Sequence, residues 1–113
     1  MQNLAKAKEE LLQQGATLIP SVLNQNDLEQ VSMVTRHMID NWLVLREKDK
    51  DFLWYKDSSD REILYRIHAI QKKHMIFLKL INNKSLSMLR DFFYDGIPTC
   101  YTECALVYRA PGL

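Results

Sequence analysis

EILYRIHAI, residues 62–70, is the clearest β-strand in the sequence. β-Branched and aromatic side chains recur in it, and such side chains favour a pleated strand. Successive side chains of a strand point to opposite faces. The expected faces are therefore Ile63, Tyr65, Ile67 and Ala69 on one side, and Leu64, Arg66, His68 and Ile70 on the other.

Helices are expected before this strand. Residues 2–14 place apolar side chains at helical spacing, and Gly15 is well placed to cap that helix. Residues 16–19 are expected to form a short strand that Pro20 stops.

A longer helix is expected from the N-cap Asn24 to about Leu45. Asp27 falls in its first turn, where a carboxylate suits the helix dipole. One face of this helix is apolar and holds Leu28, Val31, Met38, Trp42 and Leu45. The charged run 46–51 predicts a solvated loop after it.

The rest of the chain alternates between strand and helix patterns. Residues 52–55 are either a short strand or an aromatic turn, and helices are expected over 72–80 and 85–94, with a turn at 82–83. Residues 99–109 predict a long final strand. Its predicted faces are Cys100, Cys104, Leu106 and Tyr108 on one side, and Tyr101, Ala105 and Val107 on the other. Both faces are mostly apolar, so this strand needs cover on both sides.

Composition limits the class of protein. The 113 residues are 47% hydrophobic and 26% charged, with a formal net charge of +1, which is typical of one globular domain spanning residues 1–113. The sequence contains no basic stripe of the kind that indicates nucleic-acid binding. It also contains no apolar segment long enough to cross a bilayer. The N-terminus lacks the apolar region of a signal peptide, so cytoplasmic residence is expected.

Few residues carry obvious chemistry. His37 and Asp40 are three apart on one expected helix, but two ligands do not make a metal site, so a solvated helix face is favoured. His74 is expected on a wet helix surface. Cys100 and Cys104 are about 13 Å apart on a strand, too far for a disulfide, and are interpreted as buried thiols.

Arg66, His68 and Glu103 form one further candidate group. His68 is expected to be a hydrogen-bonded, half-buried histidine, or else a binding group. Glu103 lies among apolar residues, so it is either an acid with a raised pKa or a paired carboxylate at a strand edge. A small enzyme that uses these three residues requires their side chains to converge.

Two stretches carry a resemblance to a known family. The first is GATLIPSVL, residues 15–23, followed by the helix from Asn24; the second runs from FLKL, residues 77–80, through LSML, residues 86–89, to ECALVYRAPG, residues 103–112. Their order and spacing resemble the N-terminal part of the phytanoyl-CoA dioxygenase family.

The resemblance implies a fold and a chemistry. Members of that family are non-haem Fe(II), 2-oxoglutarate-dependent oxygenases with a double-stranded β-helix (jelly-roll) core and a facial triad of two histidines and one carboxylate. Their His-x-Asp motif follows the Pro-Gly turn, but residues 1–113 contain neither His-x-Asp nor His-x-Glu. Arg109 matches a family lysine that can approach the 2-oxoglutarate carboxylate; a surface arginine at a strand end is the alternative.

The expected fold is therefore α+β, with N-terminal helices packed on the opening strands of a jelly roll that is incomplete in this chain. The expected function is a truncated segment of such a hydroxylase, with no catalysis and no cofactor of its own; the complete domain would use Fe(II) and 2-oxoglutarate. The alternative is a small non-catalytic interaction module that dimerises or binds a partner through its edge strand. Expected partners are a second copy or the missing C-terminal part of the domain, and neither nucleic acid nor membrane.

Overall fold

The computed structural model of the chain describes residues 4–97 and 103–112. Its elements in order are α1 (Leu4–Gln14), α2 (Gln25–Asp40), α3 (Trp42–Leu45), β1 (Phe52–Lys56), β2 (Glu62–His68), the 3-10 helix η1 (Ile70–Lys72), α4 (Met75–Ile81), α5 (Lys84–Phe93) and β3 (Ala105–Val107). The strands form one antiparallel sheet in the order β1-β2-β3. The predicted α+β class is confirmed.

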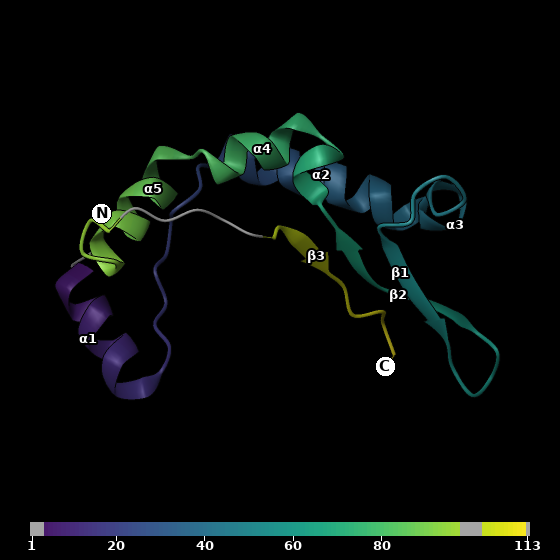
Figure 1. Cartoon of the computed structure of the whole chain (residues 1–113), viewed down its shortest axis with the longest axis horizontal. Coiled ribbons are helices and arrows are strands. Elements are labelled where there is room, and N and C mark those ends of the chain that lie inside the picture. The colour runs from purple at the N-terminus through teal and green to yellow at the C-terminus, as the bar shows by residue number, and fades with distance from the viewer. Residues whose placement is uncertain (1–3, 98–102, 113) are drawn as a thin grey trace.

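The described residues form an arch (Figure 1). α1 and α5 lie at one end, α4 and α2 run along the top, and the sheet hangs from the other end. The radius of gyration is 17.0 Å and the extents are 48 × 30 × 26 Å, whereas a compact domain of this length is expected to have a radius of about 13 Å. The elongated shape leaves many apolar side chains in contact with water.

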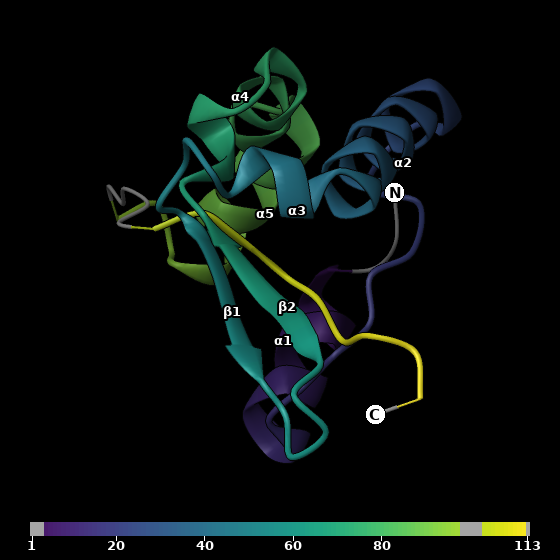
Figure 2. The same ribbon diagram turned by 90° about the vertical axis from the view of Figure 1, so that its right-hand side faces the viewer.

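One hydrophobic cluster holds the sheet to the helices. Its buried members are Met38, Phe52, Leu64, Ile67, Ile70, Ile76 and Phe77. The central strand β2 supplies the two most buried large side chains, Leu64 and Ile67, which are 2% and 0% exposed. Met38 of α2 and Ile76 and Phe77 of α4 pack in this cluster, while the β1–β2 hairpin extends away from the helices (Figure 2).

Two predicted helix ends are confirmed by their hydrogen bonds. The N–H of Gly15 donates to the Leu11 carbonyl at 2.9 Å, and Gly15 has φ +81°, a left-handed conformation that glycine adopts without strain. The Asn24 side chain accepts from the N–H of Asp27 at 2.8 Å and caps α2.

The predicted single helix to Leu45 is wrong in one detail. α2 ends at Asp40, and Asn41, with φ −114° and ψ 13°, separates it from α3. The Asn41 side-chain amide donates to the His37 carbonyl at 2.8 Å. This side chain competes with the backbone for the helical acceptor, which weakens the helix at that position.

The predicted strand over residues 16–19 is also wrong. This segment is irregular, and Leu18 is 83% exposed. A strand needs a neighbour to satisfy its backbone, and the described sheet places none beside this segment.

β2 departs from the predicted alternation because of a bulge. The register passes from Leu53↔Arg66 to Trp54↔Leu64, which leaves Tyr65 without a partner. The faces exchange at that point. Leu64 therefore joins Ile67 in the core, although strict alternation predicted opposite faces for them.

The end of β2 and the start of the next helix differ from the prediction. β2 ends at His68 instead of Ile70, because Ala69 has φ +52° and residues 70–72 form η1. The next helix begins at Met75, after the N-cap His74, whose Nδ1 accepts from the N–H of Ile76 at 3.0 Å. His74 is exposed as expected, but at a helix cap.

The remaining predictions concern residues 52–55, the turn at 82–83 and the final strand. Residues 52–55 belong to a strand, β1, and the turn at 82–83 precedes α5. The final strand was predicted over 99–109. Residues 99–102 lie outside the described part of the chain, and the described strand is limited to Ala105–Val107. None of the described helices combines the length and apolarity needed to cross a membrane.

The charged run 46–51 is more ordered than a solvated loop. The Arg46 guanidinium lies 4.4 Å from the Trp54 ring centroid and 2.8 Å from the Glu62 carboxylate. The Lys73 ammonium lies 2.8 Å from the Asp49 carboxylate and 2.5 Å from that of Asp51. These contacts tie the run to the sheet and to the segment before α4.

Candidate functional site

β3 is an edge strand, and its pairing shows which backbone groups face outward. Leu106 pairs with Ile67, and the N–H of Tyr108 donates to the Tyr65 carbonyl at 3.0 Å. Alternate residues of an antiparallel strand direct their N–H and C=O toward the same neighbour. The backbone groups of Ala105 and Val107 therefore point away from β2, to a side where the described part of the chain places no further strand.

The side chains around β3 divide between two environments. Cys104, Leu106 and Tyr108, which were predicted to share one face of the strand, all pack against the core. Val107 faces the opposite way and is 75% exposed. The helices thus cover one apolar face of this segment and leave the other in water.

A groove lies between α2 and β3. Its volume is about 530 Å³, and its lining residues are Val31, Ser32, Thr35, Arg36, Ile39 and Leu106. Val31, Thr35 and Ile39 are four apart on α2, so they form one stripe along the helix. The groove therefore runs beside the core face of an edge strand.

Arg66, His68 and Glu103 converge on the sheet. One carboxylate oxygen of Glu103, Oε1, is 2.8 Å from Arg66 Nη2 and 3.0 Å from His68 Nδ1. The three side chains are 38%, 36% and 49% exposed, respectively. Glu103 is therefore a paired carboxylate, and the contacts fasten the segment before β3 to β2 on the open surface.

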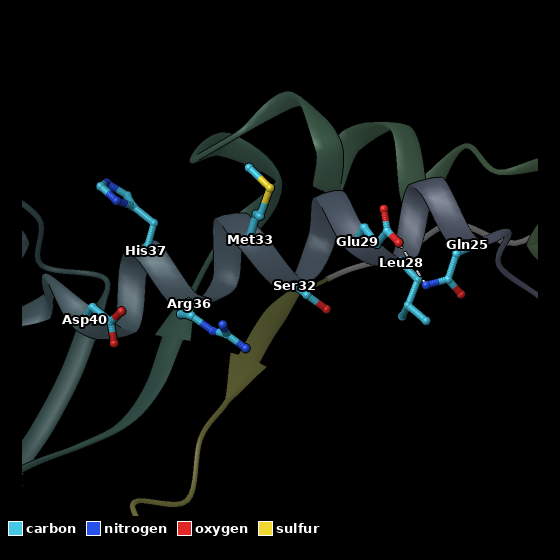
Figure 3. A pocket seen from close by; sticks show the side chains of 8 residues that line it. All are labelled: Gln25, Leu28, Glu29, Ser32, Met33, Arg36, His37 and Asp40. Carbon is cyan, nitrogen blue, oxygen red and sulfur yellow. Dashed lines mark hydrogen bonds between the residues drawn. The ribbon is translucent and has the colours of Figure 1, made fainter.

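His37 and Asp40, for which a solvated helix face was favoured over a metal site, are both exposed on α2. His37 and Asp40 belong to a shallow hollow whose lining comes entirely from α2. The His37 and Met33 side chains leave one side of the helix, and Arg36 and Ser32 leave the other (Figure 3). Among residues 4–97 and 103–112, no three histidine, cysteine or acidic side chains are grouped to hold a metal ion.

The structure also contains a second cavity, which the sequence did not predict. It has a volume of about 360 Å³ and is lined by Val34, His37, Met38, Leu45, Asp49, Phe52, Lys73 and His74. Burial lowers the pKa of Lys73, but hydrogen bonds to Asp49 and Asp51 outweigh it and hold the pKa above its ordinary value. The charge of Lys73 is thus matched within the protein by the two carboxylates. The prediction of a solvated loop over 46–51 missed this cluster.

The last two candidates lie beside β3. Arg109 is exposed, two residues beyond Val107. Cys104 is a half-buried free thiol; burial raises its pKa, partly offset by a hydrogen bond from the Gln71 backbone. A raised pKa lowers the fraction of thiolate, which is the reactive form. Cys100 lies outside the described residues.

No family model, curated protein or solved structure matches the chain. The function is therefore inferred from the arrangement of its own residues.

Proposed function

We propose that the chain is a non-catalytic α+β interaction module that binds an extended segment at the outer edge of β3. The observation that carries this proposal is the position of that edge: the outward backbone groups of Ala105 and Val107 lie next to the groove between α2 and β3. In strand addition, main-chain hydrogen bonds supply affinity and alternate side chains enter pockets that supply specificity.

The two edges of the sheet support this choice. Folded proteins protect edge strands with lysine, proline or bulges. β1 ends in Lys56 and pairs across the bulge at Tyr65. β3 is three residues long, and shortness itself protects an edge, but its sequence Ala-Leu-Val has no lysine, proline or bulge and exposes Val107.

Two kinds of interaction would favour such a contact. Each main-chain hydrogen bond contributes about 0.5–1.5 kcal/mol net, and burial of an exposed valine adds roughly 1.5 kcal/mol or more. Side chains that enter the groove add further burial against Val31 and Ile39.

Selection from a displayed library of random seven-residue peptides tests the proposal, with Val107→Lys and Val44→Lys compared. The two valines are 75% and 72% exposed, and Val44 lies on α3, away from β3. Enriched peptides should bind the wild type and Val44→Lys and lose affinity for Val107→Lys. An absence of enrichment, or equal binding to both variants, would overturn the proposal.

The oxygenase resemblance stays a prediction, and a second proposal follows from it. In that case β1, β2 and β3 are opening strands of a jelly roll, a later strand of the same domain continues the sheet at β3, and Arg109 approaches 2-oxoglutarate. The open edge of β3 supports this alternative. The described residues lack a three-donor set for iron, so no catalytic step is assigned to them. Titration with Fe(II) and 2-oxoglutarate tests it: the visible charge-transfer band should need the complete domain.

A further inference from the structure

We propose that the extended segment bound at the edge of β3 is β3 of a second copy of the chain, antiparallel about a twofold axis at Leu106. This inference rests on the proposed function and names the partner of the same edge. The product is a continuous six-stranded sheet in which the two β3 strands are central.

The backbone geometry of β3 suits this pairing. With Leu106 opposite Leu106 of the second copy, Ala105 lies opposite Val107, and both residues direct their N–H and C=O outward. Such a pair exchanges two N–H···O bonds. The twofold axis generates the pair twice, so all outward groups of both residues are satisfied.

The flanking charges are complementary in the same register. Glu103 lies three residues before Leu106 and Arg109 three residues after it. Each Glu103 therefore lies opposite Arg109 of the second copy, at both ends of the ladder. Opposite charges directly across an antiparallel pair stabilise it, and like charges destabilise it. A shift of two residues loses both charge pairs.

Glu103 is held in a position to make this contact. Arg66 and His68 both engage its Oε1 atom. A carboxylate has about four acceptor positions on two oxygens, so Glu103 can accept from a third donor and keep both contacts. By strand alternation, Glu103, Val107 and Arg109 share the face that the helices leave uncovered.

The side chains on the core face of the two paired β3 strands also fit together. The two Leu106 residues form a non-hydrogen-bonded pair, in which side chains approach closely. Leu106 lines the groove with Val31 and Ile39. The Leu106 side chain of the second copy therefore covers the open length of this groove.

The test is a charge exchange followed by sedimentation equilibrium. Arg109→Glu places two like-charge contacts in the homodimer, and Glu103→Arg does the same with the opposite sign. Each variant alone should self-associate roughly tenfold or more weakly than the wild type, because two exposed pairs become repulsive. In an equimolar mixture the heterodimer regains both complementary contacts, so association should return toward the wild-type value.

The outcomes separate this inference from the function on which it rests. A wild type that stays monomeric at millimolar concentration, or an Arg109→Glu variant that associates like the wild type, overturns the second-copy pairing. Selected peptides that depend on Val107 would still uphold the binding edge. Arg109→Glu leaves the Arg66 and His68 contacts in place, so the test remains decisive if Glu103→Arg does not fold.

Discussion

The N–H of Tyr108 donates to the carbonyl of Tyr65 at 3.0 Å, across the position of the β2 bulge. This bond continues the β2–β3 ladder beyond Val107 and determines which backbone groups of β3 face inward. Because Tyr108 and Leu106 bond to β2, Ala105 and Val107 are left for the outer side. The binding edge is thus a consequence of the register between β2 and β3.

The first prediction concerns Glu103. Glu103→Ala removes the contacts with Arg66 and His68, and the free energy of unfolding should fall by only about 0.5–1 kcal/mol, because all three side chains are more than one-third exposed. Urea denaturation measures the change. Asp91→Ala is the matched control, since Asp91 is 65% exposed and 3.7 Å from Arg90. A loss of several kcal/mol would mean that Glu103 supports the whole fold.

The second prediction concerns the core. Ile67→Ala should lower the free energy of unfolding by about 2–5 kcal/mol, because Ile67 is 0% exposed at the centre of the buried cluster. Leu18→Ala should change it by less than about 0.5 kcal/mol, because Leu18 is 83% exposed. Equal effects of the two variants in thermal or urea melts would contradict the placement of the core.

The third prediction is a dependence of stability on pH. Burial alone raises the pKa of Asp49, but hydrogen bonds from Lys73 and the Asp51 N–H outweigh it and hold the pKa below its ordinary value of 3.8. A carboxyl group with a lowered folded-state pKa stabilises the fold above the unfolded-state pKa. That contribution is lost as the pH falls through the folded-state pKa.

Asp49→Asn should therefore destabilise the protein at pH 6, and the difference from the wild type should shrink below pH 3.8. Urea melts at several pH values measure it. Asp91→Asn makes the same charge change without the Lys73 contact. A difference that stays constant down to acid pH would show that the Asp49–Lys73 contact does not stabilise the fold.

The fourth prediction concerns the start of α2. Asn24→Ala removes the acceptor of the Asp27 N–H and should cost about 1 kcal/mol. Gln25→Ala, one residue further along, should cost less, because the Gln25 side chain bonds to the Glu29 side chain on the exposed surface and caps no backbone group of α2. Circular dichroism during urea unfolding compares them. Equal losses would show that the cap contributes nothing.

Local signals predicted the local features of the fold. Asn24 and Gly15 mark helix ends because their side-chain or backbone chemistry acts within four residues. Alternation along the final strand placed Cys104, Leu106 and Tyr108 on one side. The break at Asn41 and the bulge at Tyr65 were missed. The first depends on a side-chain hydrogen bond to the His37 carbonyl and the second on the register between β1 and β2, and hydrophobic periodicity reports neither.

The candidate site depends on contacts between distant segments. Arg66 and His68 reach Glu103 across 35 or more positions in the sequence, which no pattern within one element can indicate. The sequence suggested that an edge strand binds a partner. The groove became apparent only when α2 was placed beside β3, because its lining residues are 67 or more positions away from Leu106.

Amide hydrogen exchange at Ala105 and Val107, followed by NMR over a range of protein concentrations, tests the open edge of β3 in the unmodified chain. Both amides should exchange rapidly in dilute solution and become protected as the concentration rises, while the Tyr108 amide stays protected throughout because it bonds to Tyr65. Exchange at Ala105 and Val107 that stays rapid while the protein associates would place the contact elsewhere on the molecule and refute the role given to this edge.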